Sequence, residues 1–188
     1  MSKTIAVIGS SRRNGNTGKL IDLIANELDI EVIDLGLKNI SPFDYEHKNI
    51  NDDFLPLMDY LLKYDNIIFA SPVYWFAMSS QMKIFVDRTS DFLDVEELKD
   101  KGRELRNKVG FVVSTSISQQ IDSSFIDSFT NTFKYLGMGY GGFVHLDCNN
   151  GFDSINCKSD VTTFVNKLKQ RWGRDIQGNK AWFAFVPH

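Results

Sequence analysis

Five short apolar runs separated by longer amphipathic segments constrain the fold of this chain more than any other feature. The runs are rich in Ile, Val and Phe and cover residues 4–8, 31–35, 66–71, 109–114 and 143–147. Several are apolar at every position. Strands of that kind are buried on both faces, as in a parallel sheet covered by helices, whereas half-exposed antiparallel strands alternate apolar and polar residues. The pattern therefore predicts parallel strands.

The segments between the runs carry apolar residues at helical spacing. Helices are expected over residues 17–28, 52–64, 79–91, 123–136 and 159–172. Alternating strands and helices predict a doubly wound α/β sheet, and five strands fit the flavodoxin-like order 2-1-3-4-5 better than a six-stranded Rossmann sheet. Neither a linker nor a repeat interrupts the 188 residues, so one domain over residues 1–188 is expected.

Charge and composition argue against several classes of function. The chain has 21 basic and 24 acidic residues, so its net charge is −3, with both signs interspersed. Nucleic acid and anionic membranes select clustered Lys and Arg, so neither is an expected partner. The most apolar stretch, residues 67–78, is shorter than the roughly 18 residues that a bilayer span requires. No secretory signal is seen, so we expect a cytoplasmic protein with Cys148 and Cys157 reduced and no metal site.

The loop after the first predicted strand, GSSRRNGNTG over residues 9–18, contains only residue types that can bind an anion. It enters a helix near Thr17. A helix N-terminus exposes unpaired N–H groups and a partial positive charge, glycines let the backbone approach oxygens, and Arg12 adds a charge-assisted contact. The loop therefore predicts a phosphate site. The alternative is a polar turn whose Ser, Asn and Thr residues merely cap the helix.

Two other phosphate motifs fail at this loop. A P-loop aligned on Gly18 and Lys19 requires a glycine where Arg13 stands and a hydroxyl where Leu20 stands. The dinucleotide pattern ending at Gly18 also requires a glycine in place of Arg13. Asp34 ends the second predicted strand as a ribose-binding acid does, but this acid alone is weak evidence.

The loop after the third predicted strand is unusually aromatic. It reads SPVYWFAM over residues 71–78 and places Pro72 and three consecutive aromatic residues at a strand end. In this fold class, ligands bind beyond the carboxyl ends of the strands. The loop therefore predicts a flat apolar wall for a planar ring, although core or interface packing is the alternative. A phosphate site beside a ring site implies a phosphorylated planar cofactor.

These two segments, extended through QMKIFVDR at residues 81–88, resemble the NAD(P)H-dependent FMN reductases of the flavodoxin-like fold. The resemblance spans roughly residues 3–115 and implies FMN as cofactor and NAD(P)H as co-substrate. It assigns phosphate contacts to Ser10, Arg12, Asn14, Asn16 and Thr17, and ring contacts to Pro72, Val73, Tyr74, Trp75 and Phe76. A third loop with Ser114, Thr115 and Ser116 also touches the flavin in such proteins, although many relatives have glycines there. The iron-sulfur flavoproteins are similar too, but their cysteine cluster is missing between residues 35 and 53.

Other polar residues carry less information. No G-x-S-x-G elbow accompanies the three scattered histidines, so a hydrolytic triad has little support. His145, inside the fifth predicted strand, is expected to be structural. Lys83, Asp87 and Arg88 share a helix, where Lys83 and Asp87 are placed to pair and a surface or interface role is expected. The charged segment 91–108 is expected to be a solvated connector.

The resemblance implies an oxidoreductase in which a nicotinamide donates hydride to flavin and a small acceptor then takes two electrons in the same pocket. Acceptors in the resembled family are typically quinones, azo or nitro compounds, free flavin or metal chelates. The alternatives are a one-electron carrier that does not use nicotinamide and an adaptor without flavin. Carriers tend to have strongly acidic surfaces, and a net charge of −3 is mild.

The end of the chain is apolar where no further core position is expected. Residues 173–188 form this tail and include Trp182, Phe183 and Phe185. Such residues either pack along the sheet edge or meet another subunit. Together with the aromatic loop at residues 74–76, the tail favours a homodimer whose interface borders the flavin, an arrangement common in the resembled family.

Overall fold

The five apolar runs form one parallel sheet in the computed structural model, which describes residues 2–174. The strands are β1 (Thr4–Ile8), β2 (Val32–Asp34), β3 (Asn66–Pro72), β4 (Val109–Ser116) and β5 (Gly139–Asp147). Their order is β2-β1-β3-β4-β5, and every neighbouring pair is parallel. The predicted flavodoxin-like topology is thereby confirmed.

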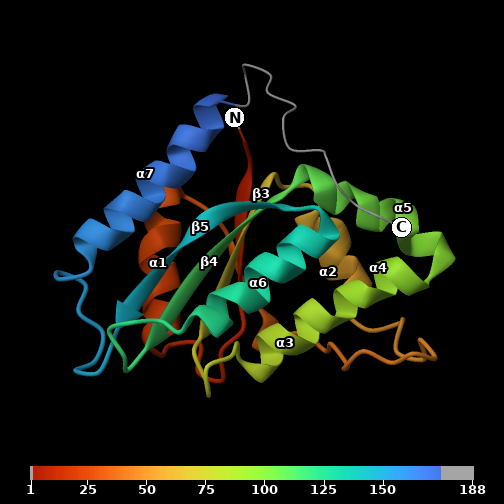
Figure 1. Cartoon of the computed structure of the whole chain (residues 1–188), viewed down its shortest axis with the longest axis horizontal. Coiled ribbons are helices and arrows are strands. Elements are labelled where there is room, and N and C mark those ends of the chain that lie inside the picture. The colour runs from red at the N-terminus through yellow and green to blue at the C-terminus, as the bar shows by residue number, and fades with distance from the viewer. Residues whose placement is uncertain (1, 175–188) are drawn as a thin grey trace.

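Helices cover both faces of the sheet (Figure 1). The helices are α1 (Asn16–Leu28), α2 (Phe54–Leu61), α3 (Ser80–Asp87), α4 (Asp91–Asp94), α5 (Lys99–Arg103), α6 (Ser123–Leu136) and α7 (Lys158–Arg174). Short 3-10 turns are η1 (Leu35–Leu37), η2 (Arg88–Ser90), η3 (Glu96–Leu98) and η4 (Glu104–Asn107). Helices α1 and α7 pack on one face, and α2, α3 and α6 pack on the other.

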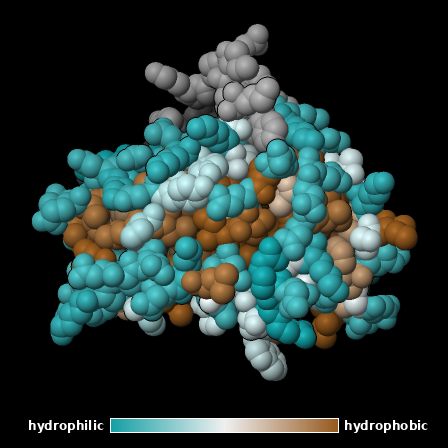
Figure 2. All heavy atoms as spheres, turned by 180° about the vertical axis from the view of Figure 1, so that it is seen from behind, coloured by the Kyte–Doolittle hydropathy of each residue, from teal (hydrophilic) through white to brown (hydrophobic). Residues whose placement is uncertain are grey.

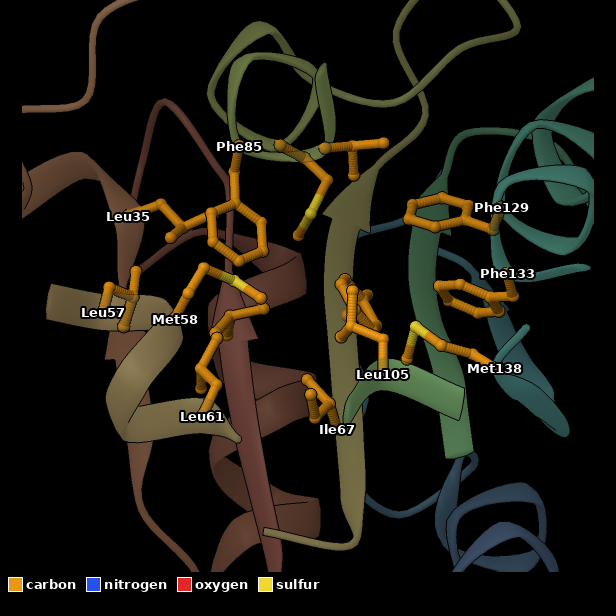
Figure 3. Close-up of a cluster of buried hydrophobic side chains, with 14 of the residues drawn as sticks. Leu35, Leu57, Met58, Leu61, Ile67, Phe85, Leu105, Phe129, Phe133 and Met138 are labelled. Atoms are coloured by element: carbon orange, nitrogen blue, oxygen red, sulfur yellow. The ribbon is translucent and has the colours of Figure 1, made fainter. Parts of the chain in front are cut away.

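The period of a strand divides the core into two layers. Ile5 and Val7 of β1 belong to the layer under α2, α3 and α6, whereas Ala6 and Ile8 belong to the layer under α1 and α7. Figure 3 shows the first layer, in which Phe129 and Phe133 of α6 point toward the sheet. The four β1 residues of both layers, 5–8, are fully buried. Burial on both faces is the physical reason for the continuous apolar runs.

Arg88 is buried, so the expectation of a surface role for this residue is wrong. Its side chain is fully covered and forms ion pairs with Asp52 and, at 2.9 Å, with Asp91. The guanidinium also lies 4.8 Å from the centre of the Phe54 ring. The segment between η1 and α2 folds over Arg88 and supplies Asp52 from 36 residues away. Helical spacing reveals only partners that are close along the chain, so this burial could not be predicted from the sequence.

The charged segment 91–108 is more ordered than a plain connector, because α4, η3, α5 and η4 follow one another within it.

A small apolar cavity among Ile67, Leu105 and Met138 lies near the ends of β3 and β5 where these strands begin. It is therefore remote from the loops that follow the strands. Figure 2 shows apolar side chains crossing the middle of the rear face between polar ones.

Three further observations concern the described part of the chain. No helix within residues 2–174 is long and apolar enough to cross a bilayer. Cys148 and Cys157 are buried and unpaired, and burial raises the pKa of both thiols. No group of His, Cys, Asp and Glu side chains in that range could hold a metal ion. Residues 175–188, and with them most of the apolar tail, lie outside the described residues.

Candidate functional site

The loop between β1 and α1 leads into a helix whose first N–H groups lack a side-chain cap. Gly15 occupies the N-cap position, and because glycine has no side chain it cannot cap the helix. No acidic residue lies in the first turn. By contrast, α3 and α6 are capped by the side chains of Ser79 and Asp122. Uncapped N–H groups at a helix N-terminus are the donors that a phosphate satisfies. The start of α1 is therefore a ready anion site.

Arg13 anchors this loop to α1 and leaves its neighbour Arg12 exposed. The Arg13 guanidinium binds the Asp22 carboxylate with two hydrogen bonds, at 2.9 and 2.5 Å, and this contact raises the pKa of Arg13. Behind the loop, a Cβ on Gly18 would stand 1.6 Å from the Arg13 carbonyl oxygen, so only glycine allows this close approach. Arg12 has an exposed side chain with no hydrogen bond to residues 2–170. It is free to meet an anion.

The other predicted phosphate residues have differing surroundings. Asn14 and Asn16 make no side-chain hydrogen bond to any described residue, so their amides are available. The Ser10 hydroxyl bonds to the backbone of Arg12 and thereby shapes the loop. The Thr17 hydroxyl is buried and lies 2.7 Å from the hydroxyl of Thr115. Thr17 therefore joins the first loop to the third.

The loop after β3 forms a tight turn that carries exposed aromatic side chains. Tyr74 and Ala77 exchange backbone hydrogen bonds of 2.9 and 3.0 Å. Between them, Trp75 and Phe76 have φ angles of 49° and 64°, in the left-handed region that favours glycine and asparagine. Trp75 is 94% exposed and Phe76 is 63% exposed. Strained backbone with large exposed aromatic rings is typical of a ligand-binding position.

Direct contacts bring the three predicted loops together at one edge of the sheet. The Ser11 hydroxyl lies 2.8 Å from the Tyr74 hydroxyl, which links the first loop to the second. The Val73 N–H donates to the Thr115 carbonyl at 3.0 Å, which links the second to the third. With the pair of Thr17 and Thr115, these bonds close a ring of three loops. Pro72 is buried at the end of β3, opposite Thr115 in β4.

The hydroxyls of the third loop are bound to the protein. Ser114 Oγ lies 2.9 Å from His145 Nδ1, and Ser116 Oγ lies 3.2 Å from His145 Nε2. The same Nε2 lies 3.0 Å from the Ser118 carbonyl oxygen. Ser114, Thr115 and Ser116 lie within the end of β4 rather than in a loop after it, and the Thr115 and Ser116 carbonyls accept from the Val73 and Cys148 N–H groups. The segment is therefore held from both neighbouring strands.

Sequence analysis did not single out Ser79, which holds the first two loops in place. The Ser79 hydroxyl donates to the Gly9 carbonyl at 2.7 Å and accepts from the Met82 N–H, while the Ser79 N–H donates to Ser71 Oγ at 2.9 Å. A Cβ on Gly9 would stand 2.7 Å from Met82 N. Ser79 could have been found from the preference for serine before the first turn of a helix.

Comparison with known proteins identifies the family. Residues 2–143 match the model of the NADPH-dependent FMN reductases, which is most of the chain. The chain belongs to the NADPH-dependent FMN reductase family. YwqN of Bacillus subtilis (strain 168), whose name describes an NAD(P)H-dependent FMN-containing oxidoreductase, is 31% identical over 88% of this chain and 97% of its own length. These matches confirm the predictions of an oxidoreductase, of FMN as cofactor and of NAD(P)H as co-substrate.

Further similarities bear on the fold and on the sequence of this FMN reductase. The solved structure of a Trp repressor binding protein from Bacillus subtilis superposes with a TM-score of 0.71, at 25% identity, over 89% of this chain and 99% of the other. An FMN-dependent NADH-azoreductase from Bacillus anthracis, solved with FMN, superposes with a TM-score of 0.65 over 92% of this chain and 99% of its own, and at 14% identity it supports the fold alone. An iron-sulfur flavoprotein of Methanocaldococcus jannaschii is 33% identical over 62% of this chain and 63% of its own length.

The residues at this edge fit the parts of FMN. The uncapped start of α1 with Arg12 suits its terminal phosphate, since both supply donors or positive charge to an anion. The exposed aromatic turn at residues 74–77 suits a planar ring. A second nucleotide phosphate would need a further donor set, and the first loop offers one helix start. The site therefore fits FMN rather than FAD.

Proposed function

We propose that this FMN reductase uses NAD(P)H to reduce small, flat organic acceptors, such as quinones and azo or nitro compounds, or free flavin and metal chelates, at the edge where the three loops meet. The observation that carries the proposal is an uncapped helix start directly beside an exposed aromatic turn. Bound FMN supplies the hydride and electron chemistry there. The chain's own residues bind FMN, orient it and shield it from water.

We assign the phosphate to the first loop. The N–H groups at the start of α1 donate to it, Arg12 adds positive charge, and the amides of Asn14 and Asn16 complete the donor set. Ser10 and Thr17 support the site by shaping the loop and by fixing it to Thr115. The Arg13 bridge to Asp22 holds the loop while Arg12 remains free.

We assign the ring to the second and third loops. Tyr74, Trp75 and Phe76 form an apolar wall, and the backbone after Pro72 reads the polar rim of the ring. The backbone of residues 114–116 lies beside this wall, because Val73 donates to Thr115. Backbone N–H donors aimed at the ring stabilise negative charge that develops on reduction.

Exposed apolar side chains at this edge support flat apolar acceptors. Leu37 and Tyr45 follow β2, Ile117 follows β4, and these three side chains are 82%, 85% and 78% exposed. Small-molecule sites are commonly lined by apolar and aromatic side chains with few polar groups. Nicotinamide and acceptor therefore use one pocket in turn, and the protein needs no side-chain nucleophile.

An anaerobic absorption spectrum tests the proposal. The purified protein should be yellow and release FMN on denaturation, and NADPH should bleach the flavin in one two-electron step. Steady-state kinetics with NADPH and a quinone should give parallel lines, whereas intersecting lines would mean two separate sites. A flavin that NADPH leaves oxidised would favour the one-electron carrier, and a colourless protein without affinity for FMN would favour the adaptor.

We further propose that the protein acts as a homodimer in the cytoplasm, with the aromatic turn at the subunit interface. A fully exposed Trp75 beside Phe76 supports this arrangement, because clustered exposed aromatic residues favour contact with another surface. Size-exclusion chromatography with light scattering tests it. A chain ending at Gly178 should elute at a lower mass than the full chain. A full chain that is monomeric at micromolar concentration would contradict the dimer.

A further inference from the structure

His145 lies behind the third loop, where no motif assigns it a task. It stands in β5 directly opposite Ser114 of β4 in the register of the sheet. Its ring reaches three groups of the segment 114–118: Ser114 Oγ at 2.9 Å, Ser116 Oγ at 3.2 Å and the Ser118 carbonyl oxygen at 3.0 Å. One side chain from the edge strand thus holds both the strand end and the loop that follows it.

We propose that His145 is a positioning residue that fixes the third loop for flavin binding, as a neutral imidazole with its proton on Nε2. The Ser118 carbonyl oxygen can only accept, so Nε2 must carry the hydrogen. Nδ1 is then an acceptor, and the Ser114 hydroxyl donates to it. This inference rests on the proposed function, because the loop matters only if the flavin binds beside it.

Ser114 makes the direction of these bonds specific. Its side chain is fully buried, and within residues 2–170 its hydroxyl has no partner other than His145. A ring with its proton on Nδ1 would reverse this bond and leave the buried Ser114 hydrogen without an acceptor, which is unfavourable. The same ring would present a lone pair to the Ser118 carbonyl. Both ends of the ring therefore select one tautomer.

On the β5 side the Ser116 carbonyl oxygen already accepts from the Cys148 N–H at 2.7 Å, whereas within residues 2–170 the Ser118 carbonyl is reached from β5 by His145 alone. Thr115 is held from the opposite direction by Thr17 and by the Val73 N–H. Beyond it, Ser116 bonds with Ser118, through an N–H donated to Ser116 Oγ at 3.0 Å and a hydroxyl donated to the Ser118 carbonyl at 3.1 Å. Ser116 is fixed as the last residue of β4, and His145 Nε2 connects the turn beyond it to β5 through the Ser118 carbonyl. Without that donor, the backbone of residues 117–118 is free to adopt other conformations.

Three substitutions separate the two ends of the ring. His145→Phe keeps a flat ring and removes both contacts. His145→Gln places an amide where Nε2 stands and keeps a donor for Ser118, whereas His145→Asn places its amide near Nδ1 and keeps only an acceptor for Ser114. FMN is titrated into each FMN-free protein, and flavin fluorescence gives the dissociation constant. Thermal unfolding of the same samples shows whether each variant keeps its fold.

We expect His145→Phe to weaken FMN binding about tenfold, because it removes the donor to the Ser118 carbonyl, and one lost hydrogen bond has about that effect. We expect His145→Gln to bind within about threefold of the unaltered protein, and His145→Asn to resemble His145→Phe. Unchanged FMN affinity in His145→Phe would overturn the inference. So would a Gln variant as weak as the Phe variant, because the donor to Ser118 would then not be the important contact.

Nitrogen NMR of the unaltered protein tests the tautomer independently. Labelled histidine in the FMN-free protein should show His145 protonated at Nε2 and bare at Nδ1 near neutral pH. The opposite tautomer overturns the inference whether or not FMN binds. If the unaltered protein shows no affinity for FMN while the tautomer is as expected, the proposed function fails and the contact to the loop remains.

Discussion

Replacing Trp75 by glycine tests whether the aromatic turn contributes to FMN binding independently of the stability of the fold. In most proteins, removing a tryptophan side chain from the interior costs about 3 to 5 kcal/mol. Trp75 is 94% exposed, so the folded protein buries only about 15 Å² of its side chain. Losing that buried area costs about 0.4 kcal/mol. Its φ of 49° is costly for a bulky residue, by about 1 to 2 kcal/mol, and glycine removes that cost.

Glycine also increases the freedom of the unfolded chain, which lowers stability by about 0.4 to 1 kcal/mol. These contributions nearly cancel. We therefore expect the free energy of unfolding of Trp75→Gly to lie within about 1 kcal/mol of the unaltered protein. FMN affinity should fall about five- to tenfold, since aromatic stacking is worth about 1 kcal/mol. Denaturant unfolding of the FMN-free protein measures the free energy of unfolding without a contribution from bound ligand.

Two control variants sharpen this experiment. Asp29 also has a positive φ, 53°, but it caps the far end of α1. Asp29→Gly should change stability equally little and leave FMN affinity unchanged. Trp75→Phe should retain most of the affinity, because it keeps an aromatic ring in the turn. A loss of 3 kcal/mol or more in Trp75→Gly, or an unchanged FMN affinity, would refute the reasoning.

Three further predictions follow from the same contacts. Arg12→Ala should weaken FMN binding by about 1.5 to 3 kcal/mol, the range for hydrogen bonds to charged groups, and unchanged affinity in an FMN titration would remove Arg12 from the site. Gly18→Ala should weaken FMN binding more than fivefold, because its Cβ would stand 1.6 Å from the Arg13 carbonyl oxygen and force the loop open; the same titration checks it, and native affinity would show that the loop adapts. Burial acts to raise the pKa of Asp52, but hydrogen bonds from the Ser41 and Phe54 N–H groups and from Arg88 outweigh it and lower that pKa. The stability that Asp52 contributes is therefore present above its unfolded pKa of about 3.9 and lost as pH falls through its lower folded value. In denaturant unfolding, the difference between the unaltered protein and Asp52→Asn should shrink below about pH 4, and a difference independent of pH would contradict this linkage.

The fold was predictable because its strands are buried on both faces. Strand β1 was expected over residues 4–8 and is observed there, since an unbroken apolar run has no other suitable environment. The first four residues of β5 were missed, because GYGG is unlike a strand sequence. Gly141 lies where a Cβ would stand 2.2 Å from the Phe111 ring, and Gly142 has a φ of 123° at an irregularity in the register. Packing against the Phe111 ring requires glycine at 141 and the positive φ favours glycine at 142, and local propensity cannot show either.

The candidate site, like the fold, was predictable from the sequence only in part. The sequence was enough to predict an anion-binding loop and an aromatic loop, because glycine, arginine and consecutive aromatic residues at strand ends carry local physical signals. It could not show that Arg13 pairs with Asp22 while Arg12 has no side-chain hydrogen bond within residues 2–170. Both are arginines in the same loop, and only the path of the backbone decides which one faces α1.

The sequence by itself predicted the flavodoxin-like strand order and two candidate ligand loops, because each is carried by residues that are neighbours along the chain, and the resemblance of those loops to a known family implied FMN. The tertiary structure decided which groups meet: Thr17 with Thr115 across 98 residues, Ser11 with Tyr74 across 63, and His145 with Ser114 across 31. It also placed Arg88 in the interior with Asp52. Hydrogen bonds and ion pairs depend on distance and direction in space, and no spacing along the chain specifies these until the sheet has brought its strand ends together.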